Sequence, residues 1–239
     1  MLSRVIAALC LAGGIAVAHA GTPVYFTDFN GALPVEIDPG SATLTGVQNF
    51  AGLGPVGNMF GGSFLRSATG NTVTLTLTGL PAHDSISLAF LFAAIDSLDG
   101  TGSFPSGDFL NVTLDGTSIF RESFANALAT QTQSYVSPAN VELARHVELG
   151  FSGGGFYTDS AYDLGADPIF QNITHTASTA SFTFRIEGEG IQDLNDESWA
   201  MDNVRVSVNP VPEPETYALM IAGLALLAWT ARRRMLNAA

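Results

Sequence analysis

Alternating hydrophobic and polar residues run through the middle of the chain. Residues 72–78 alternate threonine with valine or leucine, so that one face of the segment is apolar and the other carries threonines. Segments 109–114, 181–186 and 203–208 repeat this two-residue period, which is typical of antiparallel strands with one buried face. Segment 85–95 is nearly all apolar, as expected of a central strand that is buried on both faces.

Turn signals between these segments indicate the fold class. Asp115 and Gly116 lie between two apolar strands, and an Asp-Gly pair favours a type I′ hairpin because both positions need a positive φ. One short helix is predicted at 124–131, and the pattern shows no sustained helical period elsewhere before residue 215. We therefore predict an all-β fold, an antiparallel two-sheet β-sandwich of jelly-roll type over residues 21–208.

The N-terminus has the pattern of a secretory signal. Arg4 precedes an apolar stretch over residues 5–17, and Ala18-His19-Ala20 offers a cleavage site with small residues at its first and last positions. We predict a signal peptide over residues 1–20, so that the mature protein begins at Gly21.

The C-terminus joins a proline-rich linker, an apolar run and a basic cluster. Prolines keep the linker extended, and the apolar run from Tyr217 to Ala231 can satisfy its backbone in lipid only as a helix. The arginines behind it are costly to move across a bilayer and stay cytoplasmic. The run is about 22 Å long as a helix, against a hydrocarbon core of about 30 Å. We predict a short transmembrane helix over about 216–231.

The order of these C-terminal parts resembles the PEP-CTERM sorting signal of Gram-negative bacteria. The residues that carry the resemblance are Val211, Pro212, Glu213, Pro214, Arg232, Arg233 and Arg234. It implies that residues 209–239 are a sorting segment and a transient anchor in the inner membrane. It also implies processing by an exosortase, a membrane-embedded cysteine protease, and delivery to the cell surface or the exopolysaccharide matrix. The resemblance covers only this end of the chain.

Composition limits the partners. The net charge is −13 and the chain has no lysine, so its surface repels nucleic acid and anionic lipid. An acidic surface suits calcium, cationic partners or simple solubility outside the cell. The single cysteine, Cys10, lies in the predicted signal peptide, which leaves the mature chain without disulfides or thiolate ligands.

Acidic residues gather where turns are expected. Asp96 and Asp99 follow the apolar segment 85–95, and Asp108 comes just before the next predicted strand, with glycines that let the backbone turn. Loops rich in carboxylate oxygens suit a hard cation such as calcium, which takes about six to eight oxygen ligands. The spacing is not that of an EF-hand. The alternative is that Asp96 and Asp99 cap turns through their own backbone.

A second acidic loop leads into the last predicted strand. Residues 193–206 run from this loop through Trp199 to Asp202. The pattern resembles the closing strand of secreted bacterial jelly-roll domains related to carbohydrate-binding modules. The resemblance implies that the last strand lies beside the first, with a structural calcium where they meet, so that Asp28 approaches Asp202. The calcium candidates are Asp28, Asp96, Asp99 and Asp202.

Three aromatic residues are candidates for stacking on sugar rings: Phe156, Tyr157 and Trp199. Phe156 and Tyr157 follow a run of glycines, which favours an exposed loop. Trp199 has the alternative role of a buried anchor between the sheets.

Catalytic motifs are missing from the sequence. The histidines lack metal-ligand spacing, and neither a nucleophile elbow nor a phosphate-binding glycine loop occurs. We therefore expect no enzyme but a structural or adhesive component of the exopolysaccharide matrix. The first alternative is a calcium-stabilised glycan-binding module. The second is a secreted glycan-active hydrolase that uses paired carboxylates such as Asp196 and Glu197.

Overall fold

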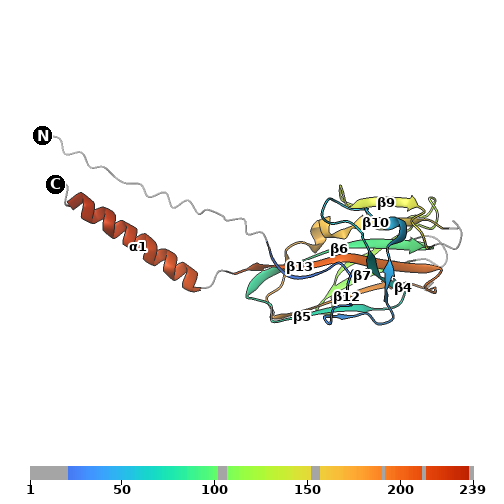
Figure 1. Ribbon diagram of the computed structural model, residues 1–239, viewed down its shortest axis with the longest axis horizontal. Coiled ribbons are helices and arrows are strands. Elements are labelled where there is room, and N and C mark those ends of the chain that lie inside the picture. Colours follow the sequence, from blue (N-terminus) through green and yellow to red (C-terminus); the bar gives the residue numbers. More distant parts are fainter. Residues whose placement is uncertain (1–20, 102–106, 152–156, 190–191, 212–213, 237–239) are drawn as a thin grey trace.

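A computed structural model describes residues 21–101, 107–151, 157–189, 192–211 and 214–236. The described chain forms two antiparallel sheets that face each other, followed by one C-terminal helix (Figure 1). The prediction of an antiparallel β-sandwich is confirmed. The predicted signal peptide, residues 1–20, lies outside the described residues.

The first sheet has eight strands and is the longer layer. Its strands are β1 (Thr22–Thr27), β3 (Thr43–Gly46), β4 (Ser63–Ala68), β6 (His83–Asp96), β9 (Glu142–Val147), β10 (Asp159–Asp163), β11 (Ile173–Thr174) and β13 (Glu197–Pro210). They follow the order β3-β4-β13-β6-β10-β9, with β1 also on β13 and β11 also on β6. The first strand therefore lies beside the last one, as the resemblance implied.

The second sheet has five strands in the order β2-β5-β12-β7-β8. Its strands are β2 (Ile37–Asp38), β5 (Val73–Thr78), β7 (Phe109–Leu114), β8 (Thr117–Ser123) and β12 (Thr179–Glu187). Short 3-10 helices η1 (Gln48–Phe50), η2 (Leu164–Ala166) and η3 (Pro168–Phe170) lie in the connections.

The main core fills the space between the sheets. In β5 the alternation gives buried Val73, Leu75 and Leu77, with threonines on the other face. The nearly all-apolar sequence of β6 is explained by packing on both of its faces. A smaller apolar cluster that includes Phe50 and Phe64 covers the outer face of the first sheet, so β6 is buried on both sides.

Local turn chemistry was predicted in part. Asp115 and Gly116 both have positive φ, at 49° and 79°, as the type I′ hairpin between β7 and β8 requires. The helix predicted at 124–131 is wrong, because the described chain has turns and an isolated bridge there. The Asn126 side-chain amide donates hydrogen bonds to the carbonyls of Asp96 and Thr158, which holds this segment against the end of β6 instead.

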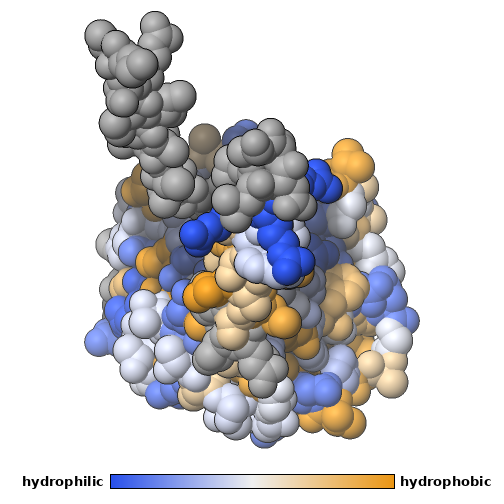
Figure 2. Space-filling view, turned by 90° about the vertical axis from the view of Figure 1, so that its left-hand side faces the viewer, coloured by the Kyte–Doolittle hydropathy of each residue, from blue (hydrophilic) through white to orange (hydrophobic). Residues whose placement is uncertain are grey.

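The C-terminal helix α1 (Pro214–Leu236) lies apart from the sandwich (Figure 1). Apolar side chains along it are exposed, including Leu219 at 74% and Leu227 at 66%. Figure 2 faces the end from which the helix projects and shows hydrophilic beside hydrophobic residues. Among the described residues, no helix combines the length and apolarity expected of a membrane span. The transmembrane helix predicted over about 216–231 stays a prediction.

Candidate functional site

Three carboxylates meet at one end of the sandwich. Asp99 follows the end of β6, Asp108 directly precedes β7, and Glu197 begins β13. Because β13 runs antiparallel to β6 with Glu197 opposite Asp96, the start of one strand is brought to the end of the other. One oxygen of each carboxylate in the trio Asp99, Asp108 and Glu197 lies within 4.8 Å of the others. We call this trio the acidic cluster.

Hydrogen bonds fix the carboxylates of the acidic cluster. The backbone N–H of Asp99 donates to Asp108 Oδ2 at 2.6 Å, and the Gln131 side-chain amide donates to Asp99 Oδ1. Glu197 accepts from Thr69 Oγ1 and from the Gln192 side-chain amide, each at 3.3 Å. All of these donors are neutral, so the described residues supply hydrogen bonds but no close cation.

The electrostatics of the acidic cluster favour protons or cations. Burial raises the pKa of Asp108 to about 6, and the charge of Asp99 adds to the effect. Burial also raises the pKa of Glu197 to about 8, with further contributions from Asp108 and Asp99. Burial raises the pKa of Asp99 as well. A hard divalent cation among these oxygens would relieve the same repulsion that now favours protonation.

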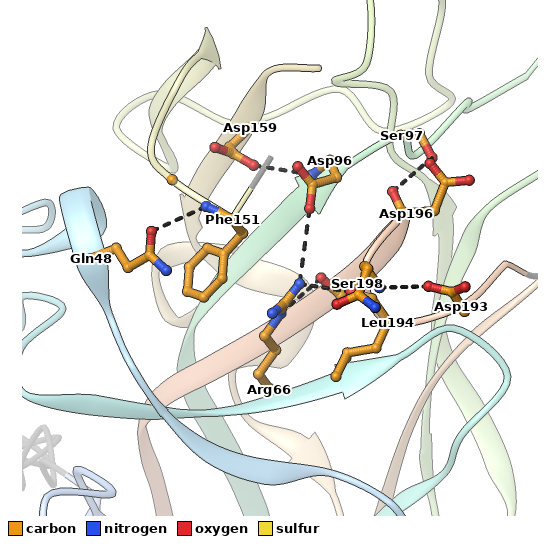
Figure 3. A network of polar contacts seen from close by, with 12 residues as sticks. Gln48, Arg66, Asp96, Ser97, Phe151, Asp159, Asp193, Leu194, Asp196 and Ser198 are labelled. Atoms are coloured by element: carbon orange, nitrogen blue, oxygen red, sulfur yellow. Dashed lines mark hydrogen bonds and ion pairs between the residues drawn. The ribbon is translucent and has the colours of Figure 1, made fainter. Parts of the chain in front are cut away.

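A buried arginine lies next to this end of the sandwich (Figure 3). Arg66 Nη2 is 3.9 Å from Asp96 Oδ2, and its guanidinium donates to Ser198 Oγ at 3.0 Å and to the Leu194 carbonyl at 2.7 Å. The guanidinium carbon also lies 4.3 Å from the centre of the Phe151 ring. Arg66 therefore ties β4 to β13 and to the loop that precedes it.

Asp96 is the charged partner of Arg66 and is fully buried with a positive φ of 62°. Its backbone N–H donates to Asp159 Oδ1 at 3.0 Å, and the Leu149 N–H donates to Asp159 Oδ2 at 2.7 Å. Neither carboxylate oxygen of Asp96 has a hydrogen-bond partner among the described residues. Burial raises the pKa of Asp96 to about 6, although Arg66 opposes the shift, and it raises the pKa of Asp159 to about 7.

The four predicted calcium ligands do not form one group. Asp99 belongs to the acidic cluster, and Asp96 faces Arg66. Asp202 lies farther along β13, where it accepts hydrogen bonds from the N–H groups of Gly61 and Asn203. Its pKa is raised to about 7, mainly by burial and in small part by the charge of Asp28. Neither Asp28 nor Asp202 belongs to the acidic cluster.

The aromatic candidates have different surroundings. Phe156 lies outside the described residues. Tyr157 is half-buried, and its pKa is raised by burial and then by the charges of Asp196, Asp99, Asp96 and Glu197, so it lies beside the acidic end.

Trp199 is fully buried, with its ring 6.5 Å from that of Phe92. This burial fits the alternative role of an anchor between the sheets.

Two histidines that are 92 residues apart in the sequence lie next to each other. His83 Nε2 lies 2.7 Å from His175 Nδ1, His83 Nδ1 donates to the Pro81 carbonyl at 2.6 Å, and His175 Nε2 lies 3.0 Å from Asp115 Oδ2. The Pro81 carbonyl and the Asp115 carboxylate at the two ends of this row both accept, so His83 Nδ1 and His175 Nε2 must each carry a proton. The contact between the two rings needs one more proton, on either His83 Nε2 or His175 Nδ1, to be a hydrogen bond. The row ties β6 to the β7–β8 hairpin.

Comparison with known proteins identifies the C-terminal segment. Residues 210–234 match the PEP-CTERM protein-sorting motif. This motif implies an exported protein with a membrane-anchored precursor that is processed by an exosortase. The chain has no match among curated proteins.

Two solved structures resemble the sandwich weakly. One is a family GH115 4-O-methyl-α-glucuronidase with specificity for decorated arabinogalactans, at 11% identity and a TM-score of 0.36. That likeness covers 81% of this chain but only 18% of the glucuronidase. The other is the CBM22-2 xylan-binding domain from Paenibacillus barcinonensis, at 11% identity and a TM-score of 0.34, covering 77% of this chain and 99% of the domain.

Proposed function

We propose that this protein is an exported surface protein of a Gram-negative bacterium, with a non-catalytic structural or adhesive role in the exopolysaccharide matrix. The observation that carries the proposal is the sorting motif at residues 210–234, directly after the last strand of the sandwich. The sorting segment would direct the sandwich domain out of the cytoplasm. The sandwich is then the part that remains outside the cell.

Helix α1 and the arginines at its end would hold the precursor at the inner membrane. Exposed apolar side chains along α1 favour a lipid environment, and Arg232–Arg234 favour the cytoplasmic side. An exosortase would then act at the linker around Val211–Pro214. This sequence of events leaves the sandwich intact, because the helix makes up no part of either sheet.

Cell fractionation tests the proposal. We expect wild-type protein in the surface or matrix fraction as a processed form, and a variant that lacks residues 214–239 in a different fraction. Replacing Arg232, Arg233 and Arg234 together by glutamine should cause accumulation of precursor, whereas replacing them by lysine keeps the charge and should preserve sorting. Wild-type protein found unprocessed in the cytoplasm, or unchanged sorting of the deletion variant, would contradict the proposal.

A calcium-stabilised glycan-binding module is the second candidate, favoured by the acidic cluster. Its three carboxylates come from the end of β6, the start of β7 and the start of β13, so one cation would join both sheets. Asp99, Asp108 and Glu197 would be its protein ligands, and the cation would replace the protons that their raised pKa values favour.

Calorimetry with calcium tests this candidate directly. We expect calcium to raise the melting temperature of EDTA-treated protein, and Glu197→Gln to remove most of that rise. The exposed Glu36 offers a matched control, since it precedes β2 at the edge of the second sheet, where its carbonyl accepts from the Thr76 N–H, and Glu36→Gln makes the same change there. An equal calcium effect in wild type and Glu197→Gln would place any cation elsewhere.

The hydrolase alternative has less support. Glu197 is 1% exposed and Asp108 is 2% exposed, whereas paired glycosidase carboxylates face an open cleft. Asp196 is half-buried and its carboxylate lies within 3.4 Å of the Ser97 hydroxyl, which donates to it. An assay of purified protein on a polysaccharide panel would test the alternative, and release of reducing ends that Glu197→Gln abolishes would establish it.

A further inference from the structure

A pocket lies at the edge of the first sheet, beside β9. Its volume is about 390 Å³, within the range of about 300–1,000 Å³ of small-molecule sites. One wall is the segment 131–137 and the other is β9, which is the last strand of its sheet. The polar residues that line it are Gln131, Thr132, Gln133, Tyr135, Ser137, Glu142 and Arg145.

Four of the lining side chains are already engaged within the protein. The Gln131 amide donates to Asp99, and Thr132 Oγ1 donates to the Thr101 carbonyl at 2.8 Å. Gln133 Oε1 accepts from the Ala125 N–H at 3.1 Å, and the Tyr135 hydroxyl donates to Asp167 Oδ2 at 2.8 Å. These contacts fix the walls of the pocket. They leave Ser137, Glu142 and Arg145 as the groups able to bind a ligand.

Two residues that line this pocket each have a buried polar atom without a hydrogen-bond partner among the described residues: Arg145, through Nε, and Ser137, through Oγ. Arg145 also has no ion pair within 4.0 Å in the described chain, in contrast to Arg66 with Asp96 and Arg121 with Glu187. An unpartnered buried donor is costly, so a small shift of either side chain towards a polar occupant of the pocket would be favourable.

The charges of the pocket identify the class of ligand. Arg145 offers hydrogen-bond donors, and Glu142 offers acceptors from the same strand, without an ion pair of 4.0 Å or less between them in the described chain. A simple anion would be repelled by Glu142, and a simple cation by Arg145. A neutral molecule with several hydroxyl groups satisfies both, because each hydroxyl donates to a carboxylate and accepts from a guanidinium.

We propose that this pocket binds one sugar unit of a neutral glycan, held by Arg145, Glu142 and Ser137. The exposed side chain of Val136, at the same rim, offers an apolar surface for the C–H face of the ring. The inference rests on the glycan-binding form of the proposed function and names the site and the ligand class. Gln131, which lines the pocket, also donates a hydrogen bond to Asp99 of the acidic cluster. A cation bound in the acidic cluster would therefore help to fix this wall of the pocket.

The proposal is tested by the binding of defined sugars to the chain that begins at Gly21 and keeps α1, purified in detergent. The probes are neutral oligomers of glucose, galactose and mannose, with glucuronic and galacturonic acid oligomers as the anionic arm. We expect saturation-transfer NMR and calorimetry to detect a neutral oligomer, and Arg145→Gln and Glu142→Gln each to weaken binding at least tenfold. Ser137→Ala should weaken it by a smaller factor.

Controls separate the site from the fold and from the wider function. Arg185→Gln removes an exposed arginine of β12 and should leave affinity unchanged, and circular dichroism melting must show that each pocket variant is folded. Neutral-sugar binding that survives in folded Arg145→Gln and Glu142→Gln would overturn the pocket while leaving a glycan-binding function intact. Preference for the uronic acids, or no sugar binding by protein that is sorted normally, would also overturn the proposal without affecting the sorting assignment.

Discussion

At the scale of single residues, burial and mutual repulsion act together at the acidic end of the sandwich, because both make it costly to charge the carboxylates there. Asp108, Glu197 and Asp99 are close enough to repel one another, and their donors are neutral. Arg66 forms its ion pair with the neighbouring Asp96 and not with a member of the acidic cluster, as far as the described residues show. The cost of this arrangement depends on pH, because protonation removes the repulsion.

The pKa of Glu197 predicts how stability changes with pH. Its folded pKa of about 8 is above the usual 4.5, so the folded protein binds this proton more tightly than the unfolded chain does. The free energy of unfolding should therefore fall as pH rises from about 4.5 to about 8. The fall is at most about 1.4 kcal/mol for each pH unit in this range. Urea unfolding in EDTA across the range measures it.

Glu197→Gln should flatten this pH dependence and raise stability at pH 8 in EDTA, while Glu36→Gln, at an exposed position beside β2, should leave it unchanged. Asp108, with a pKa raised to about 6, contributes in the same direction at lower pH. Stability that rises between pH 5 and 8 in EDTA would contradict the raised pKa values of both groups.

Removing Arg66 tests the buried ion pair. We expect Arg66→Met to destabilise the protein by about 3–5 kcal/mol, because Asp96 loses its cation and Ser198 and Leu194 lose a donor. Adding Asp96→Asn should recover part of the loss in a double-mutant cycle. Arg185→Met, at an exposed position, should change stability by less than about 0.5 kcal/mol. Equal destabilisation by both arginine variants would refute the role of Arg66.

At the scale of elements, periodicity predicted the strands because alternation and burial are local properties. Segment 109–114 coincides with β7, and the apolar segment 85–95 lies within β6. The acidic cluster was predicted in part, since Asp99 and Asp108 were grouped as carboxylates between two strands, but Glu197 was not placed with them. Their meeting depends on the pairing of Glu197 with Asp96 across the sheet, and a single sequence does not contain that register. The paired histidines were missed for the same reason.

The hairpin between β7 and β8 allows a test of one local rule. Gly116 has a φ of 79°, and a Cβ built there meets nothing within 4 Å. Gly116→Ala should therefore cost about 1 kcal/mol through backbone conformation alone. Gly31 has the same open surroundings without a positive φ, so Gly31→Ala should be neutral or slightly stabilising. Chemical unfolding of both variants gives the comparison.

At the scale of the whole molecule, the sandwich and α1 are separate units joined by one linker (Figure 1). The last backbone hydrogen bond before the linker is donated by the Val211 N–H to the Ala82 carbonyl at 3.1 Å. A chain that ends at Val211 should therefore keep the full sandwich. We expect its melting temperature to lie within about 2–4 °C of the full-length protein, which corresponds to about 1 kcal/mol. A larger fall would show that α1 stabilises the sandwich.

The path of β13 has a mechanical consequence. This strand runs from Glu197 to Pro210 between β6 on one side and β4 and β1 on the other, and the tail continues directly from its end. Tension on an anchored tail would pull along the axis of β13. The backbone hydrogen bonds on both sides of the strand would then be loaded in parallel, and they would not break one after another. A cell that tethers this protein by its C-terminus would be holding it by the strand best placed to resist being drawn out.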